Sequence, residues 1–381
     1  MLKLKNVAKA AALSAALTLG WTAAVQAQTL KIGLIGPMTG AGAAWGFAAK
    51  GSMQTLADEV NAKGGLEVGG KKHKVEVVAY DDQYKAAEAV AAYQRLTTRD
   101  GVKYIIIQTS APTMALKQQV EDDKVIALTT SYTPAAIDEK TKFMFRAYST
   151  ATDFMPPYAA WMKANLKERR MVLLNPNDET GWAQTKTTEK LFKENGFDVL
   201  SAELYERTAK DFSPILAKVL ALKPEVMDLG ASSPATAGLI VRQAREAGFK
   251  GRFVQTGGAG WLEVVATAGK EAAEGMVNLL YVDHSNPAFQ RLAADYKKQF
   301  NGSTPNDMIG VYYDAMSVLL AAIRKAGDVN DTTKVSQSFQ SVLPMKGLLG
   351  DEMTYAYQQI RTYDYVGVMK NGVPVVMGKI K

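Results

Sequence analysis

The chain has 381 residues, 47% of them hydrophobic and 22% charged, with a formal net charge of +7, and this composition is typical of a soluble globular protein. It contains no cysteine, which excludes disulfides, thiolate nucleophiles and zinc–thiolate or iron–sulfur centres, and only two histidines, His73 and His284, which excludes a histidine-rich metal site. Because a single hydrophobic core stops growing at roughly 250–300 residues, a chain of this length is expected to fold into two lobes.

Residues 1–27 have the pattern of a secretory signal peptide. Three lysines form a basic start, an apolar run at 10–25 follows, and small residues precede Gln28. This run of 16 residues is shorter than a membrane-spanning helix, and no cysteine is present to carry a lipid anchor. We therefore expect cleavage near Ala27, which lowers the formal charge from +7 to +4, and a soluble mature chain in the periplasm.

The first half of the mature chain alternates strand and helix signals. Short apolar segments predict strands at 30–36, 75–80, 104–107 and 125–128. The spacing of apolar residues predicts helices at 44–62, 86–98 and 113–123. Gly64-Gly65 is expected to end the first helix, since glycine is the usual residue after a helix C-terminus.

The second half repeats this alternation. Strands are predicted at 171–174, 199–204, 226–229 and 253–255. Ser213-Pro214 and Ser233-Pro234 predict helix starts, each with a capping hydroxyl before a proline in the first helical position. Further helices are predicted at 287–299 and 307–325, and Asn371-Gly372 predicts a hairpin between strands at 366–370 and 373–377.

Alternating strands and helices predict an α/β fold, because right-handed crossovers lay helices over both faces of a parallel sheet. The expected architecture has two similar open-sheet lobes joined by three crossings, at 143–148, 277–282 and 347–355. The first lobe is expected at 28–146 plus 284–347, and the second lobe at 147–283 plus 348–381. Three crossings between two open sheets leave a cleft where the sheets face each other.

Four blocks of sequence carry a resemblance to a known family. They read KIGLIGPMTGAGAAWG at 31–46, VNAKGGLEVGGKKHKVEVVAYDD at 60–82, DGVKYIII at 100–107 and IVRQAREAGFKGRF at 240–253. These blocks resemble the type I periplasmic binding proteins of the leucine/isoleucine/valine-binding branch, and the resemblance covers nearly the whole mature chain. It implies a monomeric, non-enzymatic substrate-binding component of an ABC importer, without cofactor or metal, that closes by a hinge motion on a ligand between its lobes.

Hydroxyl side chains follow two neighbouring strands of the first lobe, where the N–H groups at helix starts attract anions. Thr109 and Ser110 follow one strand, and Ser131 and Thr133 follow the next. In the resembled family these two loops hold the carboxylate of the ligand, which implies that role for Ser110, with Ser131 and Thr133 beside it. The alternative is that Ser110 and Thr133 only cap helices, since Thr133-Pro134 has the pattern of an N-cap.

Two tryptophans are candidates for packing against the body of the ligand. Trp45 lies in the first strand–helix turn, where the resembled family often has an aromatic residue, and Trp182 lies at the matching place of the second lobe. Tryptophan is also a common core residue, so a structural role is the alternative for both. Tyr148 and Trp261 are weaker candidates.

The second lobe departs from the resembled family at 255–260. Amino-acid receptors of that family usually present an acid there to pair with the ammonium of the ligand, whereas this chain reads QTGGAG, with Gly257 at its centre. Because a buried, unpaired ammonium is costly, either Asp178 or Asp81 replaces the acid, or the ligand carries no amine. A branched-chain or other hydrophobic amino acid and an aromatic or aliphatic carboxylic acid both stay open.

Enzyme functions find little support in the sequence. Residues 40–45 nearly match the dinucleotide-binding fingerprint, but Trp45 replaces the glycine that close helix–strand packing needs. No G-x-S-x-G elbow is present, and the adjacent acids Asp81-Asp82 are more typical of a solvated strand end than of a metal site.

The expected partners are a small carboxylate ligand and an ABC permease in the cytoplasmic membrane. No nucleic-acid partner is expected, because the basic residues are interleaved with acidic ones. The alternative function is a binding protein that reports ligand occupancy to a membrane receptor, and the fold alone does not separate sensing from import.

Overall fold

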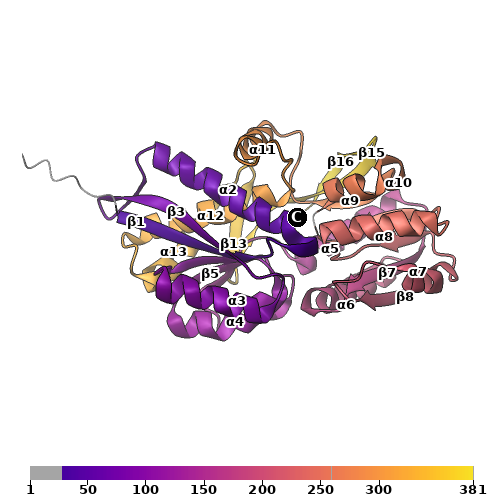
Figure 1. Cartoon of the computed structure of the whole chain (residues 1–381), viewed down its shortest axis with the longest axis horizontal. Coiled ribbons are helices and arrows are strands. Elements are labelled where there is room, and N and C mark those ends of the chain that lie inside the picture. Colours follow the sequence, from indigo (N-terminus) through magenta and orange to yellow (C-terminus); the bar gives the residue numbers. More distant parts are fainter. Residues whose placement is uncertain (1–27, 259, 381) are drawn as a thin grey trace, which may run out of the picture.

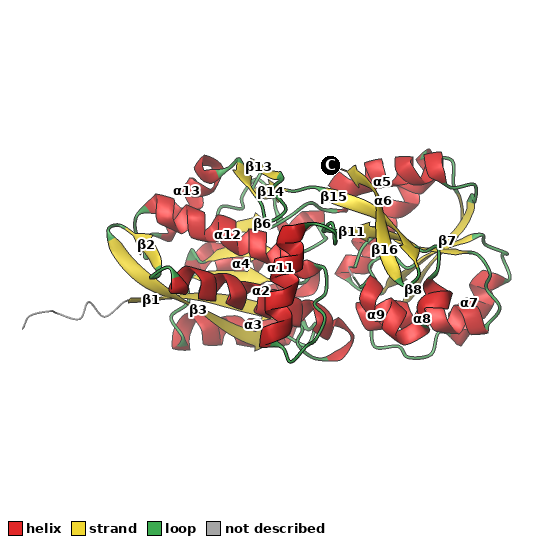
Figure 2. Ribbon diagram, turned by 90° about the horizontal axis from the view of Figure 1, so that it is seen from above, coloured by secondary structure: helices red, strands yellow, loops and turns green. Residues whose placement is uncertain are grey.

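The computed structural model of this chain describes residues 28–258 and 260–380, so the expected signal peptide at 1–27 lies outside the described residues. Two lobes lie side by side along the long axis of the molecule (Figure 1). Each contains an open, mainly parallel sheet covered by helices, as the alternation of strands and helices predicted (Figure 2). Within the described residues, no helix has both the length and the apolar character that crossing a membrane requires.

The first lobe is built on a nine-stranded sheet with the order β12-β13-β14-β6-β5-β4-β1-β3-β2. Its parallel core consists of β6 (Met144–Arg146), β5 (Ile126–Thr129), β4 (Tyr104–Ile107), β1 (Gln28–Gly36) and β3 (Lys71–Asp81). The edges are β2 (Leu66–Val68) on one side and β12 (Met345–Lys346), β13 (Glu352–Ala356) and β14 (Gln359–Arg361) on the other. The helices of this lobe are α2 (Ala43–Ala62), α3 (Ala86–Gln94), α4 (Ser110–Asp123), α11 (Pro287–Gln299), α12 (Met308–Ala326) and α13 (Thr332–Val342).

The second lobe is built on a seven-stranded sheet with the order β16-β15-β11-β10-β9-β7-β8. Its parallel core consists of β8 (Asp198–Tyr205), β7 (Arg170–Pro176), β9 (Val226–Asp228), β10 (Arg252–Gln255) and β11 (Val277–Leu280). The predicted hairpin is confirmed as β15 (Asp364–Lys370) and β16 (Val373–Ile380). The helices are α5 (Ala151–Asn165), α6 (Glu179–Glu194), α7 (Ser213–Leu220), α8 (Pro234–Glu246), α9 (Trp261–Ala268) and α10 (Lys270–Ala273).

Burial explains why the central strands were readable from the sequence. All four residues of β4 are buried, and so are all four of β5, because helices cover both faces of a parallel sheet. Such strands are continuous apolar runs rather than alternating ones. The four residues of β11 in the second lobe are also buried, but this segment was expected as part of a crossing and instead lies within the second sheet.

The third crossing between the lobes differs from the expected one. The strands β13 and β14 belong to the first sheet, whereas 348–381 was expected in the second lobe. Gln359 of β14 pairs with Arg146 of β6, and the backbone N–H of Arg146 donates to the carbonyl of Gln358 at 2.7 Å. The chain therefore crosses between Arg361 and Asp364, after a short hairpin that was expected in the second lobe but pairs with the first sheet.

The helix starts at the two Ser-Pro pairs also differ from the prediction. Ser213 is the first residue of α7 rather than its cap, because Phe212 holds the cap position. Ser233 does precede α8, but its side chain does not cap the helix and instead accepts a hydrogen bond from Arg207 at 2.7 Å.

The segment Asn61–Gly65 fixes the end of α2 against β3. The side chain of Asn61 donates to the carbonyl of Val75 and accepts from its N–H, both at 2.8 Å. Gly65 has a φ of +93°, and a Cβ there would lie 2.6 Å from the carbonyl oxygen of His73. Only glycine tolerates this left-handed turn so close to a neighbouring strand, which explains the NAKGG block noted in the sequence.

We expect Asn61→Ala to lower the free energy of unfolding by about 1–3 kcal/mol, because it leaves the N–H and carbonyl of Val75 without their partner. Urea denaturation of the mature chain measures this change. Lys50→Ala, an exposed position on the same helix, is the matched control and is expected to stay within about 0.5 kcal/mol of the wild type. Equal stability of the two variants would contradict the bridging role of Asn61.

Candidate functional site

The strand order of each sheet creates a crevice at one defined place. In the first lobe β1 pairs with β3 on one side and with β4 on the other, so consecutive crossovers leave in opposite directions. In the second lobe β7 stands in the same relation to β8 and β9. Ligands of open parallel sheets bind beyond the carboxyl ends of the strands at such switch points.

A cavity lies between these two crevices and contains about 410 Å³ of atom-free space. The first lobe contributes Trp45, near the start of α2, and residues 108–110 after β4. The second lobe contributes Thr180 from the first turn of α6 and Ala231 from the loop after β9. Six of its thirteen lining residues are aromatic and none is charged, so its walls combine apolar surface with neutral polar groups. The full lining is Trp45, Tyr84, Gln108, Thr109, Ser110, Thr130, Tyr132, Tyr148, Thr180, Ala231, Tyr281, Met308 and Tyr312.

A directed chain of hydrogen bonds ends at Ser110. The hydroxyl oxygen of Ser110 accepts from the backbone N–H of Tyr132 at 3.2 Å and from the hydroxyl of Ser131 at 3.1 Å. Ser131 in turn accepts from the backbone N–H of Thr133 at 3.3 Å. Because a serine oxygen has two acceptor positions, both positions of Ser110 are occupied. Its own proton is left to be donated to another group.

Thr109 adds a second polar group without a partner. This residue is 5% exposed, its hydroxyl has no hydrogen-bond partner in the described chain, and it lines the cavity. Thr109 holds the N-cap position of the fourteen-residue helix α4 without a side-chain capping bond, and the first N–H groups of this helix have no intrahelical carbonyl to bond. Two hydroxyls and a helix N-terminus thus converge on the cavity from the first lobe, an arrangement that favours an acceptor group or an anion.

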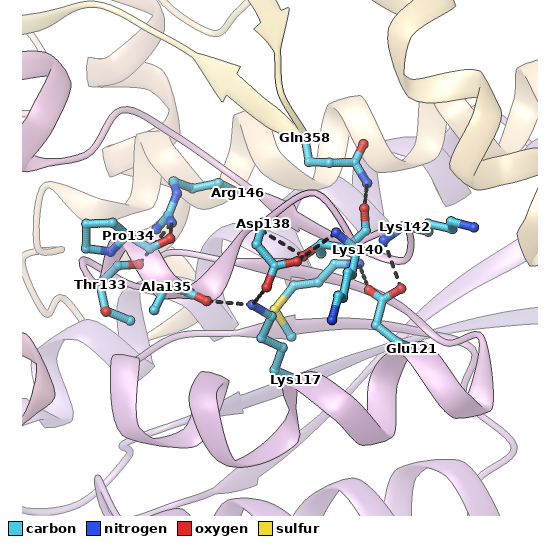
Figure 3. A network of polar contacts seen from close by, with 12 residues as sticks. Lys117, Glu121, Thr133, Pro134, Ala135, Asp138, Lys140, Lys142, Arg146 and Gln358 are labelled. Atoms are coloured by element: carbon cyan, nitrogen blue, oxygen red, sulfur yellow. Dashed lines mark hydrogen bonds and ion pairs between the residues drawn. The ribbon is translucent and has the colours of Figure 1, made fainter.

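The loop that carries Ser131 and Thr133 is held from behind by Arg146 (Figure 3). The Arg146 guanidinium donates to the carbonyls of Ser131, Thr133 and Pro134, the last two at 3.0 and 3.4 Å. Burial lowers the pKa of Arg146 to about 10, so the side chain is a cation at neutral pH. Nearby, Lys117 donates to the carbonyl of Ala135, at 2.6 Å, which ties the same loop to α4.

Several contacts cross the cavity from one lobe to the other. The Tyr84 hydroxyl lies 3.2 Å from the Thr180 hydroxyl, and the Arg207 guanidinium lies 4.1 Å above the Tyr84 ring. The backbone N–H of Gly258 donates to the Tyr132 hydroxyl at 3.2 Å. These contacts join residues on opposite sides of the cavity and hold the lobes in a closed arrangement.

The expected site residues divide into two groups. Trp45, Thr109 and Ser110 line the cavity, and Ser131 lies directly behind Ser110. Tyr148, a weaker candidate, also lines it.

Trp182, Thr133 and Gly257 do not line this cavity. Trp182 is 51% exposed, donates from its indole to Asn177 at 2.9 Å, and lines a separate surface groove with Thr133. Gly257 lies behind the Tyr132 wall, since a Cβ at this position would be 3.2 Å from the Tyr132 hydroxyl. The other weak candidate, Trp261, donates to Asp307 of α12 at 2.9 Å and so links the lobes beside the cavity.

The sequence missed most of the tyrosines that form the walls. Tyr84, Tyr281 and Tyr312 come from three separate segments, and no local pattern relates them. Tyr132 could have been found, because it stands between the two predicted residues Ser131 and Thr133. Burial raises the pKa of Tyr84 to about 12 and also raises the pKa of Tyr312, so these phenols are neutral at physiological pH.

Asp178 and Asp81, which could replace the acid missing at 255–260, both have other partners. Asp178 accepts from the N–H groups of Thr180 and Gly181 and forms an ion pair with Arg207 at 2.5 Å. Asp81 accepts from the N–H of Met38 and other donors of the turn after β1. Neither carboxylate lines the cavity. Among the described residues, no group of three or more histidine, aspartate and glutamate side chains is arranged to hold a metal ion.

The chain is similar to known binding proteins in both sequence and fold. Residues 29–372 match the family described as periplasmic binding protein. The leucine-, isoleucine-, valine-, threonine- and alanine-binding protein of Pseudomonas aeruginosa is 27% identical over 317 residues, which is 83% of each chain. A leucine-binding protein from Thermotoga maritima has a TM-score of 0.81 at 25% identity, over 93% of this chain and 99% of that one.

A solute-binding protein of an ABC transporter from R. palustris, solved in complex with benzoate, is similar in fold alone. Its TM-score is 0.79 at 18% identity, over 92% of this chain and 96% of that one.

Asp82 contributes to the pH dependence of stability alongside other buried acids such as Asp228 and Asp314. It is a fully buried carboxyl directly after β3, and its second oxygen has no hydrogen-bond partner. Burial raises the pKa of Asp82 to about 7, whereas an unfolded aspartate titrates near 4. Between these values the folded state keeps a proton that the unfolded state has released. The free energy of unfolding therefore falls as the pH rises from about 4 to about 7.

We expect Asp82→Asn to flatten this slope, by at most about 4 kcal/mol across the window, when thermal melts are recorded from pH 4 to pH 8. Asp81→Asn is the matched control. Hydrogen bonds hold the pKa of Asp81 below its usual range, so its carboxylate is ionised in both states above pH ~5 and the wild-type slope should remain there. A wild-type slope in Asp82→Asn would show that Asp82 does not titrate as described.

Proposed function

The chain belongs to the periplasmic binding proteins, and on that premise we propose that it is the extracytoplasmic substrate-binding component of an ABC importer, which holds a small carboxylate between its two lobes. The family consists of solute-binding proteins, so the function is binding rather than catalysis. The relative from Pseudomonas aeruginosa binds leucine, isoleucine, valine, threonine and alanine, and the R. palustris protein was solved with benzoate. A carboxylate is the chemical group that these ligands share.

The observation that carries this proposal is the uncommitted proton of Ser110. Both acceptor positions of its oxygen are taken by Tyr132 and Ser131, so the hydroxyl can offer the cavity only a donor. A ligand oxygen that accepts this proton also meets the partnerless hydroxyl of Thr109 and the positive end of α4. Hydrogen bonds to a charged acceptor are stronger than neutral ones, which favours a carboxylate over a carbonyl or an alcohol.

Closure of the lobes supplies the mechanism of capture. Ligand meets the hydroxyls of the first lobe in an open form, and the second lobe then rotates about the three crossings until Thr180 reaches Tyr84. A ligand that contacts both lobes binds the closed form better than the open form and so shifts the population toward closure. The proposed division of the chain into lobes follows the sheets, with crossings at 147–150, 281–286 and 362–363.

The proposed partner is an ABC permease in the cytoplasmic membrane, met in the periplasm by a monomeric binding protein after removal of the expected signal peptide. The fold alone does not separate import from sensing, so a measurement of uptake decides between them. Uptake of a radiolabelled ligand by cells that lack the gene, with and without its restoration, tests this part. Normal uptake in the deletion strain, together with a lost transcriptional or chemotactic response to the ligand, would assign sensing instead.

We expect Ser110→Ala to weaken the binding of a carboxylate by about 1.5–3 kcal/mol, because it removes a hydrogen bond to a charged group. Isothermal titration with leucine, phenylacetate and 4-methylpentanoate identifies a carboxylate that binds, and the same titration on the variant gives the loss. Ser317→Ala, on α12, removes a serine hydroxyl that only bonds the carbonyl of Tyr313 and is the matched control. Unchanged affinity in Ser110→Ala would show that Ser110 only begins α4 and does not bind the ligand.

The contact between Tyr84 and Thr180 is expected to favour the closed form. Tyr84→Phe removes the hydroxyl and keeps the ring under Arg207, so the affinity should fall by about 0.5–1.5 kcal/mol. Stopped-flow measurement should assign most of this change to faster dissociation of the ligand. A slower association with unchanged dissociation would contradict a role for this contact after capture.

A further inference from the structure

We propose that the ligand is an aromatic monocarboxylate that carries no ammonium group. This inference rests on the proposed function, since it names the class of carboxylate that the same cavity would take. Three features of the cavity support it: the absence of an acidic lining residue, the engagement of the hydroxyl oxygens by protein donors, and the aromatic walls.

Within residues 28–258 and 260–380, no carboxylate lines the cavity where an ammonium would lie. None of the thirteen lining residues is acidic. Asp178 is already neutralised by Arg207 and also accepts from Gly181 at the start of its own helix. An ammonium buried without a counter-charge is strongly disfavoured, so an amino acid would lose affinity here relative to the same acid without its amine.

The buried acids that lie behind the walls do not replace the missing partner. Asp228 is fully buried and accepts from the N–H of Gly230 and from the side chain of Thr256. Asp82 accepts from the N–H of Tyr84, and it does not line the cavity. Asp228 is held by the loops after β9 and β10, Asp82 is held by the turn after β3, and neither lines the cavity.

The neutral oxygens of the tyrosine walls are also engaged. Tyr132 accepts from the N–H of Gly258, Tyr84 bonds to Thr180, and the Tyr312 hydroxyl lies 2.9 Å from that of Thr130. An ammonium has three protons to donate and no ability to accept. Because the Tyr132–Gly258 and Tyr84–Thr180 bonds join the lobes, an ammonium that drew these two oxygens to itself would weaken closure.

The aromatic walls favour an aromatic body. With their hydroxyls bonded to the protein, Tyr84, Tyr132 and Tyr312 leave ring faces and edges for contact with the ligand, beside the indole of Trp45. The existing rings already pack edge to face, as Tyr148 and Tyr281 do with centroids 5.5 Å apart. An aromatic ligand extends this packing, whereas an aliphatic chain gains contact area alone.

Titration of the wild-type protein with pairs of acids that differ only in the amine tests the proposal. Phenylacetate is compared with phenylglycine, and 4-methylpentanoate with leucine, by isothermal titration up to about 1 mM. We expect phenylacetate to bind most tightly and each acid to bind at least about tenfold more tightly than its amino counterpart. Tighter binding of leucine or phenylglycine than of its partner would overturn the inference and leave the proposed function intact. Tighter binding of 4-methylpentanoate than of phenylacetate would overturn the aromatic part.

Phenylacetamide separates the failure of the proposed function from the failure of this inference. It has the same shape as phenylacetate without the charge, so equal affinity for the two would show that the cavity does not recognise a carboxylate. Absence of binding by all four acids would overturn both proposals. Binding of phenylacetate that survives Ser110→Ala unchanged would leave the ligand class standing and reject its proposed position.

Ala231→Asp provides a gain-of-function test. Ala231 lines the cavity from the second lobe and is 1% exposed, so a carboxylate introduced here would lie at the cavity wall. Ala231→Asn adds nearly the same volume without charge and is the matched control. We expect the ratio of phenylglycine to phenylacetate affinity to rise at least about tenfold in the aspartate variant relative to the asparagine variant. An equal ratio in both, with cooperative thermal unfolding confirming that both fold, would contradict the assignment of the missing counter-charge.

Discussion

The position of the site depends on the strand order of the two sheets. Each sheet has a topological switch point, and the two switch points face each other across the gap between the lobes. In the first lobe the crossovers diverge between β1 and β4, and in the second lobe between β7 and β9. The turns at these places bring residues from four different strands to one cavity. These residues are Trp45, Ser110, Thr180 and Ala231. A different strand order would disperse these residues along the two sheet edges even if every strand and helix were kept.

Within this frame, the polarity of the site is set by backbone donors rather than by charged side chains. The backbone N–H groups of Tyr132 and Thr133 can only donate, so the hydroxyl oxygens of Ser110 and Ser131 accept from them. Ser131 then donates its proton to Ser110, and Ser110 is left to donate its own proton into the cavity. Arg146 holds the same loop by its carbonyls, and its charge remains behind the wall rather than in the cavity. The site therefore offers hydrogen-bond donors to an anion while its lining carries no net charge.

Much of the fold was predictable from the sequence, because the central strands are continuous apolar runs and the turns have clear residue signals. The juxtaposition of Ser110 and Ser131 was also predictable, since the carboxyl ends of neighbouring parallel strands meet at one edge. The tyrosine walls were not, because Tyr84, Tyr281 and Tyr312 are brought together only by tertiary packing. For Trp182 the sequence position was misleading. Its place after β7 matches that of Trp45 after β1, but its ring lies at the surface rather than in the cavity. The third crossing was misplaced because a three-residue strand such as β14 has no periodicity to read.

A crystal structure of the protein with phenylacetate tests most directly whether the first lobe holds a carboxylate between the two switch points. We expect one carboxylate oxygen within about 2.5–3.2 Å of the hydroxyl oxygens of Ser110 and Thr109, with the phenyl ring of the ligand among the tyrosines and Trp45. A carboxylate directed instead toward the second lobe, or a ligand bound outside this cavity, would contradict it.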